Sequence, residues 1–138
     1  MERRSFLKSA LACLAPFSAY SLPKLKITKV NAVELNGFNS KFVRVHTDGG
    51  LTGTGEIVDT VGVAPIINEK LGPSIESFDP LDIEGIYFHF WGWGKVPDTT
   101  WPVFMRGSGG GPYHAAVSGI EMALWDLAGK AMGVPVYR

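Results

Sequence analysis

The sequence predicts an α+β fold, a three-stranded antiparallel meander followed by three helices. Stretches rich in β-branched residues with alternating polar partners indicate strands over residues 26–35, 41–47 and 51–58. Two turn-forming clusters, at 36–40 and 48–50, separate these strands. Apolar residues at helical spacing recur in three later segments. Because short turns join neighbouring antiparallel strands, we expect one sheet packed against the helices.

The third strand carries two glycines, Gly53 and Gly55, and a further glycine, Gly50, lies in the turn before it. A glycine inside a strand marks a place where another backbone or a bulky side chain comes close. Gly50 suits a turn position with left-handed backbone. We therefore expect a close packing partner on the third strand.

Two helices are expected between the sheet and residue 92. Gly72 and Pro73 should end the first. The second should have Asp79 as its N-cap and Pro80 at its first position, and Gly92 should close it. The apolar positions are Val63, Ile66, Ile67 and Leu71 in the first helix and Ile83, Ile86, Tyr87 and Phe90 in the second.

The third helix is the clearest element of the sequence. It should begin at Pro112 and end before Gly133, and Gly119 and Gly129 lie inside it. Each internal glycine costs a helix about 0.5–1 kcal/mol relative to Ala, so a neighbour should pack against both positions. Between the second and third helices, residues 92–111 are rich in Gly, Pro and Trp without periodicity, which predicts a long structured loop.

Composition limits the chain to one small globular domain behind a targeting segment. The 138 residues include 13 basic and 13 acidic side chains, so the formal net charge is zero. No basic surface for nucleic acid or an anionic membrane is therefore expected. The single cysteine, Cys13, lies in the targeting segment, which excludes disulfides and cysteine-based metal sites from the domain.

Residues 1–21 have the pattern of a signal peptide. A basic start is followed by a mildly apolar run over 9–20, which is too short to span a bilayer that needs about 20 apolar residues. The run Arg-Arg-x-Phe-Leu-Lys at 3–8 resembles the twin-arginine export motif, from which Glu2 departs. Cleavage after Ser21 would release a chain beginning at Leu22, and we expect a periplasmic or secreted protein. A lipid-modified Cys13 and an amphipathic first helix are the weaker alternatives.

Two segments resemble the N-terminal domain of the mandelate racemase and muconate lactonizing group in the enolase superfamily. The first is Thr-Asp-Gly-Gly-Leu-Thr-Gly-Thr-Gly-Glu at 47–56. The second is Ala-Val-Ser-Gly-Ile-Glu-Met-Ala-Leu-Trp-Asp-Leu at 116–127, continued by Gly-Lys and Gly-Val-Pro-Val-Tyr up to Tyr137. The resemblance covers residues 26–138 and implies a capping domain. We expect the catalytic barrel, of about 250 residues, to follow after Arg138.

In this family the loops after the first and third strands of the cap close over the barrel mouth and contact the substrate. The resemblance therefore implies Phe38 and Asn39 as contacts in the first loop and Asp59 and Thr60 in the second. Arg106, before a glycine-rich run, could reach an acidic substrate, but a solvated surface arginine is the better interpretation.

The resemblance also implies the chemistry of the whole enzyme. Family members abstract a proton next to a carboxylate with the help of Mg²⁺, and their bases and metal ligands lie on the barrel. No catalytic or metal-binding residue is therefore expected here, and the chain alone should be inactive. The glycine-rich approach to the third helix favours a sugar-acid dehydratase over a racemase, with a small carboxylate or sugar acid as substrate and a homo-oligomer as the intact form. The alternative is a stand-alone secreted binding module with the same fold.

Other patterns are set aside. The glycine run at 107–111 lacks the Gly-Lys-Ser/Thr ending of a phosphate loop, and the three histidines have no ligand-like spacing. The aromatic residues between 87 and 101 indicate a packing surface, which we expect on the side that meets the barrel.

Overall fold

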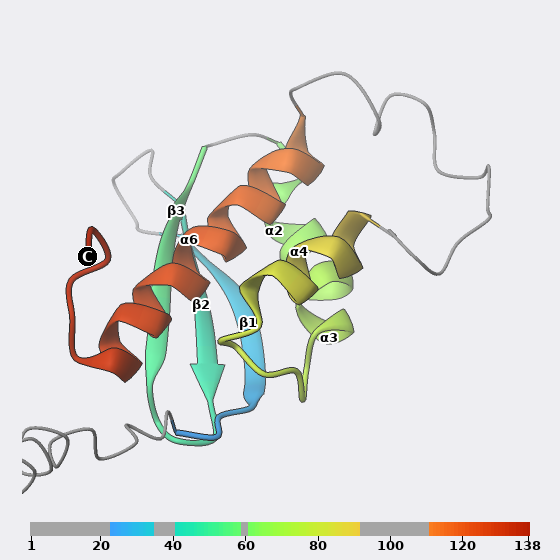
Figure 1. Cartoon of the computed structure of the whole chain (residues 1–138). Helices are drawn as coiled ribbons and strands as arrows, with labels where there is room; N and C mark the ends of the chain where they lie inside the picture. The colour runs from blue at the N-terminus through green and yellow to red at the C-terminus, as the bar shows by residue number, and fades with distance from the viewer. Residues whose placement is uncertain (1–22, 35–40, 59–60, 92–110) are drawn as a thin grey trace, which may run out of the picture.

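The computed structural model describes residues 23–34, 41–58, 61–91 and 111–138. Its sheet consists of β1 (Ile27–Glu34), β2 (Lys41–Thr47) and β3 (Thr52–Ile57), paired antiparallel in the order β1-β2-β3 (Figure 1). The helices pack on one face of this sheet, where alternate strand residues are buried. The predicted α+β fold with a three-stranded meander is confirmed.

The first helical region runs from Val63 to Ser74 without a break. It comprises α2 (Val63–Pro65), the π-helix η1 (Ile66–Leu71) and α3 (Gly72–Ser74). The predicted end at Gly72 and Pro73 is therefore wrong by two residues. In an α-helix the ring of Pro73 would clash with the carbonyl four residues earlier. The π turn avoids this arrangement, because the Gly72 N–H instead pairs with the carbonyl of Ile67, five residues back.

The next helix, α4 (Ile83–Trp91), begins later than the sequence predicts. Its N-cap is Asp82, whose Oδ1 accepts a hydrogen bond from the Gly85 N–H at 3.1 Å. Asp79 instead caps the preceding turn by accepting from the Leu81 N–H at 2.9 Å. The prediction of Asp79 as N-cap is thus corrected. Both aspartates are suitable N-cap residues. Because Pro80 lies in a turn that precedes the helix, α4 begins three residues later than predicted.

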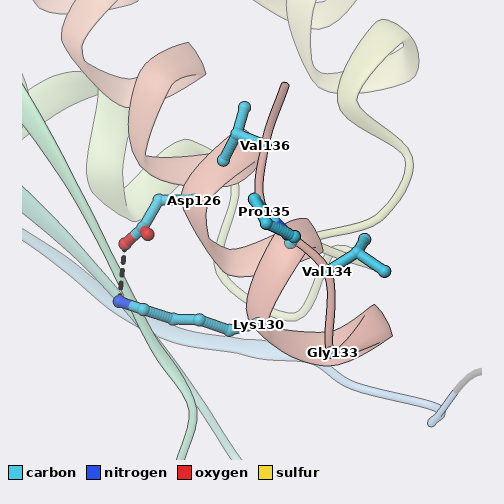
Figure 2. Close-up of a pocket in the computed structure, with 7 residues that line it drawn as sticks. Asp126, Lys130, Gly133, Val134, Pro135 and Val136 are labelled. Carbon is cyan, nitrogen blue, oxygen red and sulfur yellow. Dashed lines mark hydrogen bonds and ion pairs between the residues drawn. The ribbon is translucent and has the colours of Figure 1, made fainter. Parts of the chain in front are cut away.

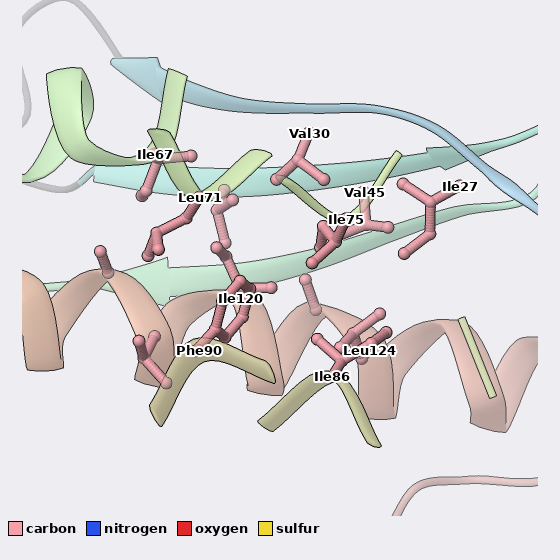
Figure 3. Packing of buried hydrophobic residues seen from close by; sticks show 14 of the residues in the cluster. Ile27, Val30, Val45, Ile67, Leu71, Ile75, Ile86, Phe90, Ile120 and Leu124 are labelled. Atoms are coloured by element: carbon pink, nitrogen blue, oxygen red, sulfur yellow. The ribbon is translucent and has the colours of Figure 1, made fainter. Parts of the chain in front are cut away.

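Helix α6 (Pro112–Met132) crosses the sheet and organises the core. Figure 3 shows Ile120 and Leu124 of α6 between Val45 of β2 and Ile86 of α4, and all four side chains are at most 1% exposed. Gly133 ends the helix in a left-handed conformation, with φ of 66°, and the Val134 N–H then bonds back to the Gly129 carbonyl. The predicted start and end of this helix are confirmed.

The glycines explain how closely α6 lies on β3. A Cβ added to Gly53 would lie 2.0 Å from the carbonyl oxygen of Ala123, and one added to Gly55 would lie 2.1 Å from that of Gly119. On the helix side, a Cβ at Gly119 would lie 2.7 Å from the Ile57 side chain. The two backbones are therefore nearly in contact, as the sequence predicts for these positions. We call this contact the glycine seam.

Candidate functional site

One edge of the sheet gathers the chain ends from which the predicted substrate loops depart. The register pairs Glu34, the last residue of β1, with Lys41, the first of β2, and Lys41 in turn with Ile57, the last of β3. The strand ends that flank segment 35–40 and precede segment 59–60 therefore lie side by side. We call Glu34, Lys41, Ile57 and Val58 the loop edge.

The start of α6 lies at the same edge. The helix runs along β3 so that Gly119 meets Gly55 near the strand's C-terminal end, and Ala123 meets Gly53 one turn further on. Its first residue, Pro112, lies close to Gly62, where an added Cβ would be 4.0 Å from the proline Cβ. The first turn of α6 therefore lies near the C-terminal end of β3 (Figure 1).

An ion pair joins the two strand ends that flank the first loop. The Lys41 Nζ lies 3.1 Å from the Glu34 Oε1, across the last pair of residues of the hairpin. The second loop begins with residues that are largely in solvent, because Val58 is 72% exposed and Val61 is 94% exposed. Exposed apolar side chains next to a hydrogen-bonded edge are suited to contact a further surface.

The predicted contact residues belong to segments that the structure does not describe. All five fall outside the described residues: Phe38, Asn39, Asp59, Thr60 and Arg106. The structure therefore describes the residues that flank these segments, and the roles of the five contact residues stay predictions. The predicted signal peptide, the close of the second helix at Gly92 and most of the loop at 92–111 also fall outside the described residues.

An aromatic group joins the end of α4 to the start of α6. The Tyr113 hydroxyl donates to the Phe90 carbonyl, and Trp91 packs against Tyr113 and His114 with ring centroids 5.8 and 4.9 Å apart. Burial raises the pKa of Tyr113 above its ordinary value, because the charged phenolate would lose its hydration. This group holds together the two helix ends from which residues 92–111 depart.

At the opposite end of α6, the chain turns back and leaves an open hollow of about 330 Å³. Figure 2 shows the segment from Gly133 to Val136 passing beside the last turns of α6, with Asp126 and Lys130 bonded to each other. Both side chains also bond to β3. The sequence predicts no site role for either residue, although an acid and a base four residues apart on a helix indicate an ion pair with each other.

Among the described residues, no group of three His, Cys, Asp or Glu side chains could hold a metal ion. In the same part of the chain, no helix has the length and apolar character needed to cross a membrane. The described residues therefore contain no ligand set for a cation.

Comparison with known families adds the context of this domain. Residues 31–138 match the model of the mandelate racemase / muconate lactonizing enzyme N-terminal domain. A D-xylonate dehydratase of Haloferax volcanii is 37% identical over 114 residues, which cover 82% of this chain and 25% of that protein. A D-galactonate dehydratase of Verminephrobacter eiseniae is 35% identical, covering 70% of this chain and 23% of that protein.

Solved structures show the same fold. A mandelate racemase/muconate lactonizing protein from Paracoccus denitrificans, complexed with magnesium, superposes with a TM-score of 0.63 at 27% identity. The match covers 82% of this chain and 29% of that one. The chain thus spans about a quarter of the length of the curated relatives it matches.

Proposed function

Because the chain belongs to the N-terminal domain family of mandelate racemase and muconate lactonizing enzymes, within the enolase superfamily, we propose that it caps the active site of a sugar-acid dehydratase. The observation that carries the proposal is that described residues next to three segments, each with a predicted contact residue, lie close together at the loop edge and the start of α6. The names of the two relatives, a D-xylonate and a D-galactonate dehydratase, support the reaction class.

In this proposal the cap supplies specificity, and a barrel that follows it in the whole protein supplies the chemistry. Phe38 and Asn39 in the first loop, and Asp59 and Thr60 in the second, contact the part of the sugar acid remote from its carboxylate. Arg106 is a further candidate for the carboxylate itself. Loops that close over a barrel exclude water and contribute contacts that favour one substrate over another.

The proposed reaction begins with abstraction of the proton next to the carboxylate and ends with loss of water from the neighbouring carbon. We propose that the whole protein requires Mg²⁺, which is supported by the magnesium complex of the Paracoccus denitrificans relative. The described residues hold no suitable group of ligands, so we assign no step of the chemistry to them. Their task is to position the loops.

The test is an activity assay of the complete reading frame that contains this chain. With Mg²⁺ present, we expect a sugar acid such as D-xylonate or D-galactonate to yield the corresponding keto acid, detected by mass spectrometry. The 138-residue chain alone should show no turnover. A complete protein that ends at Arg138, stays soluble and binds a ligand would instead support the stand-alone binding module. Turnover by the 138-residue chain alone would contradict the proposal that the barrel carries the catalytic residues.

The loop contacts have their own test in the active whole protein. Asn39→Ala should raise KM for the sugar acid more than it lowers kcat, because it removes contacts made before the chemical step. Glu84→Ala, an exposed position near the start of α4, is the matched control and should leave both constants unchanged. Equal effects of both variants would argue against a substrate contact at Asn39.

We also propose that residues 1–21 direct export through the twin-arginine pathway and that the intact protein is a homo-oligomer in the periplasm or outside the cell. The support for export is the Arg3–Arg4 pair with the apolar run behind it. Replacing both arginines by lysine should leave the protein in the cytoplasmic fraction. Unchanged export of that variant would exclude this route.

A further inference from the structure

The sheet has two edge strands in the part of the chain that the structure describes, and both are closed by groups of the same chain. At β1, the Ile27 N–H donates to the Phe78 carbonyl at 2.9 Å, and the Ser77 N–H donates to the Ile27 carbonyl at 2.8 Å. Further along β1, the Ala32 N–H donates to the Asn68 side chain at 2.8 Å. This edge is covered mainly by backbone.

The edge at β3 is closed in a different way, by two charged side chains. The Thr54 N–H donates to the Asp126 Oδ2 at 2.8 Å, and the Lys130 Nζ donates to the Thr52 carbonyl at 2.9 Å. The two side chains also form an ion pair of 2.6 Å with each other. No other described strand lies beyond β3, so these two bonds occupy outward-facing positions of its backbone.

The geometry resembles that of an added strand. Along β3, residues alternate between bonding toward β2 and bonding outward, and Thr52 and Thr54 are two neighbouring outward positions. One residue of an added parallel strand would donate its N–H to the Thr52 carbonyl and accept with its own carbonyl from the Thr54 N–H. Lys130 supplies the donor and Asp126 the acceptor. Any strand that pairs here must displace both.

We propose that Asp126 and Lys130 close the β3 edge against strand addition by a second copy of this chain. A second copy carries the same edge, with the same free donor and acceptor once the side chains rotate away, so the two edges can complete each other's hydrogen bonds. Rotation requires no unfolding, because the side chains of Lys130 and Asp126 are 46% and 32% exposed. The β1 edge offers no such route at Ile27, where backbone is already paired with backbone.

The test compares the 138-residue chain with the double variant Asp126→Ala/Lys130→Ala, which keeps the net charge unchanged. Sedimentation velocity over a wide range of concentration measures self-association. We expect the double variant to associate roughly tenfold more tightly than the parent chain, because the freed Thr52 and Thr54 groups gain hydrogen bonds from the second copy. The charge-matched control, Lys29→Ala/Glu84→Ala, changes two exposed residues on β1 and α4, neither of which pairs with β3, and should behave as the parent.

A third variant identifies the edge that associates. Adding Thr54→Pro to the double variant removes the outward N–H, which an edge strand tolerates, and should return association to the parent level. A double variant that associates no more than the parent overturns the proposal, as does association that survives Thr54→Pro. If circular dichroism shows that the double variant does not fold, Lys130→Met replaces it: stronger association than the parent supports the proposal, and unchanged association overturns it.

Discussion

The glycine seam and the loop edge are neighbours at the C-terminal end of β3, yet they tolerate change very differently. In the seam, backbone meets backbone, and an added Cβ at Gly55 would lie 2.1 Å from a carbonyl oxygen. At the loop edge, Val58 and Val61 are mostly in solvent and one ion pair joins the strand ends. Stability is therefore concentrated in the seam, whereas the exposed loop edge should tolerate substitution.

The largest effect should come from filling the seam. Gly55→Val places a branched side chain against the backbone of α6, which cannot move without shifting the helix, and should lower the free energy of unfolding by about 3 kcal/mol or more. Urea unfolding followed by circular dichroism measures the loss. Thr54→Ala is the control, because its exposed side chain lies on the opposite face of β3, and it should change stability by less than about 0.5 kcal/mol. Equal losses in both variants would show that the seam is not the rigid region.

A smaller loss is expected from the helix side of the seam. A Cβ at Gly119 would lie 2.7 Å from the Cγ2 methyl of Ile57 and 3.3 Å from the Glu56 carbonyl oxygen, so its tightest contact is with a side chain, which can shift more easily than backbone. Gly119→Ala also gains about 1 kcal/mol of helix propensity, which offsets part of the clash. We expect a net loss of about 1–2 kcal/mol by the same measurement. A loss as large as that of Gly55→Val would show that Ile57 has no room to shift.

Tyr113, at the start of α6, gives the next smaller effect. Tyr113→Phe removes the hydroxyl that donates to the Phe90 carbonyl and should lower the free energy of unfolding by about 1 kcal/mol near neutral pH. Burial raises the pKa of Tyr113 in the folded state above the unfolded value of 10.0, so the neutral phenol is favoured on folding. Its stabilising contribution is full below pH 10 and is lost as pH rises above that value.

The phenylalanine variant provides the control for that pH dependence. Its unfolding free energy should fall less steeply above pH 10 than that of the parent, because the titrating group is gone. Parallel pH profiles for the two proteins would show that Tyr113 does not cause the alkaline loss.

The sequence predicts the elements of both regions well because their signals are local. Alternation fixes the strands, periodicity fixes α6, and glycines inside regular elements indicate the close approach of backbones. Local sequence could not decide between Asp79 and Asp82 as N-cap, since both precede a helical pattern by a few residues. It also could not anticipate that a π turn would carry the first helix past Pro73.

The remaining features depend on contacts between distant parts of the chain. Asp126 reaches a strand residue 72 positions earlier, and Lys130 one 78 positions earlier, so no local pattern reveals what they bond. The proximity of the loop edge to the start of α6 likewise follows from the register and from the direction of α6 along β3. The contact residues predicted from family resemblance fall outside the described residues, and their roles stay predictions.

The smallest effect should come from the loop edge itself. Glu34→Gln removes the ion pair with Lys41 while keeping the size of the side chain, and Glu34 is 61% exposed, so water replaces most of the lost interaction. We expect a loss of less than about 1 kcal/mol, which shrinks further in high salt because exposed charges are screened. In the whole protein the same variant should raise KM for the sugar acid although it changes stability little, since it removes the ion pair at the base of the loop that carries Phe38 and Asn39. A stability loss comparable to that of Gly119→Ala would mean that the loop edge, like the seam, is part of the rigid framework, and the contrast between the two regions would fail.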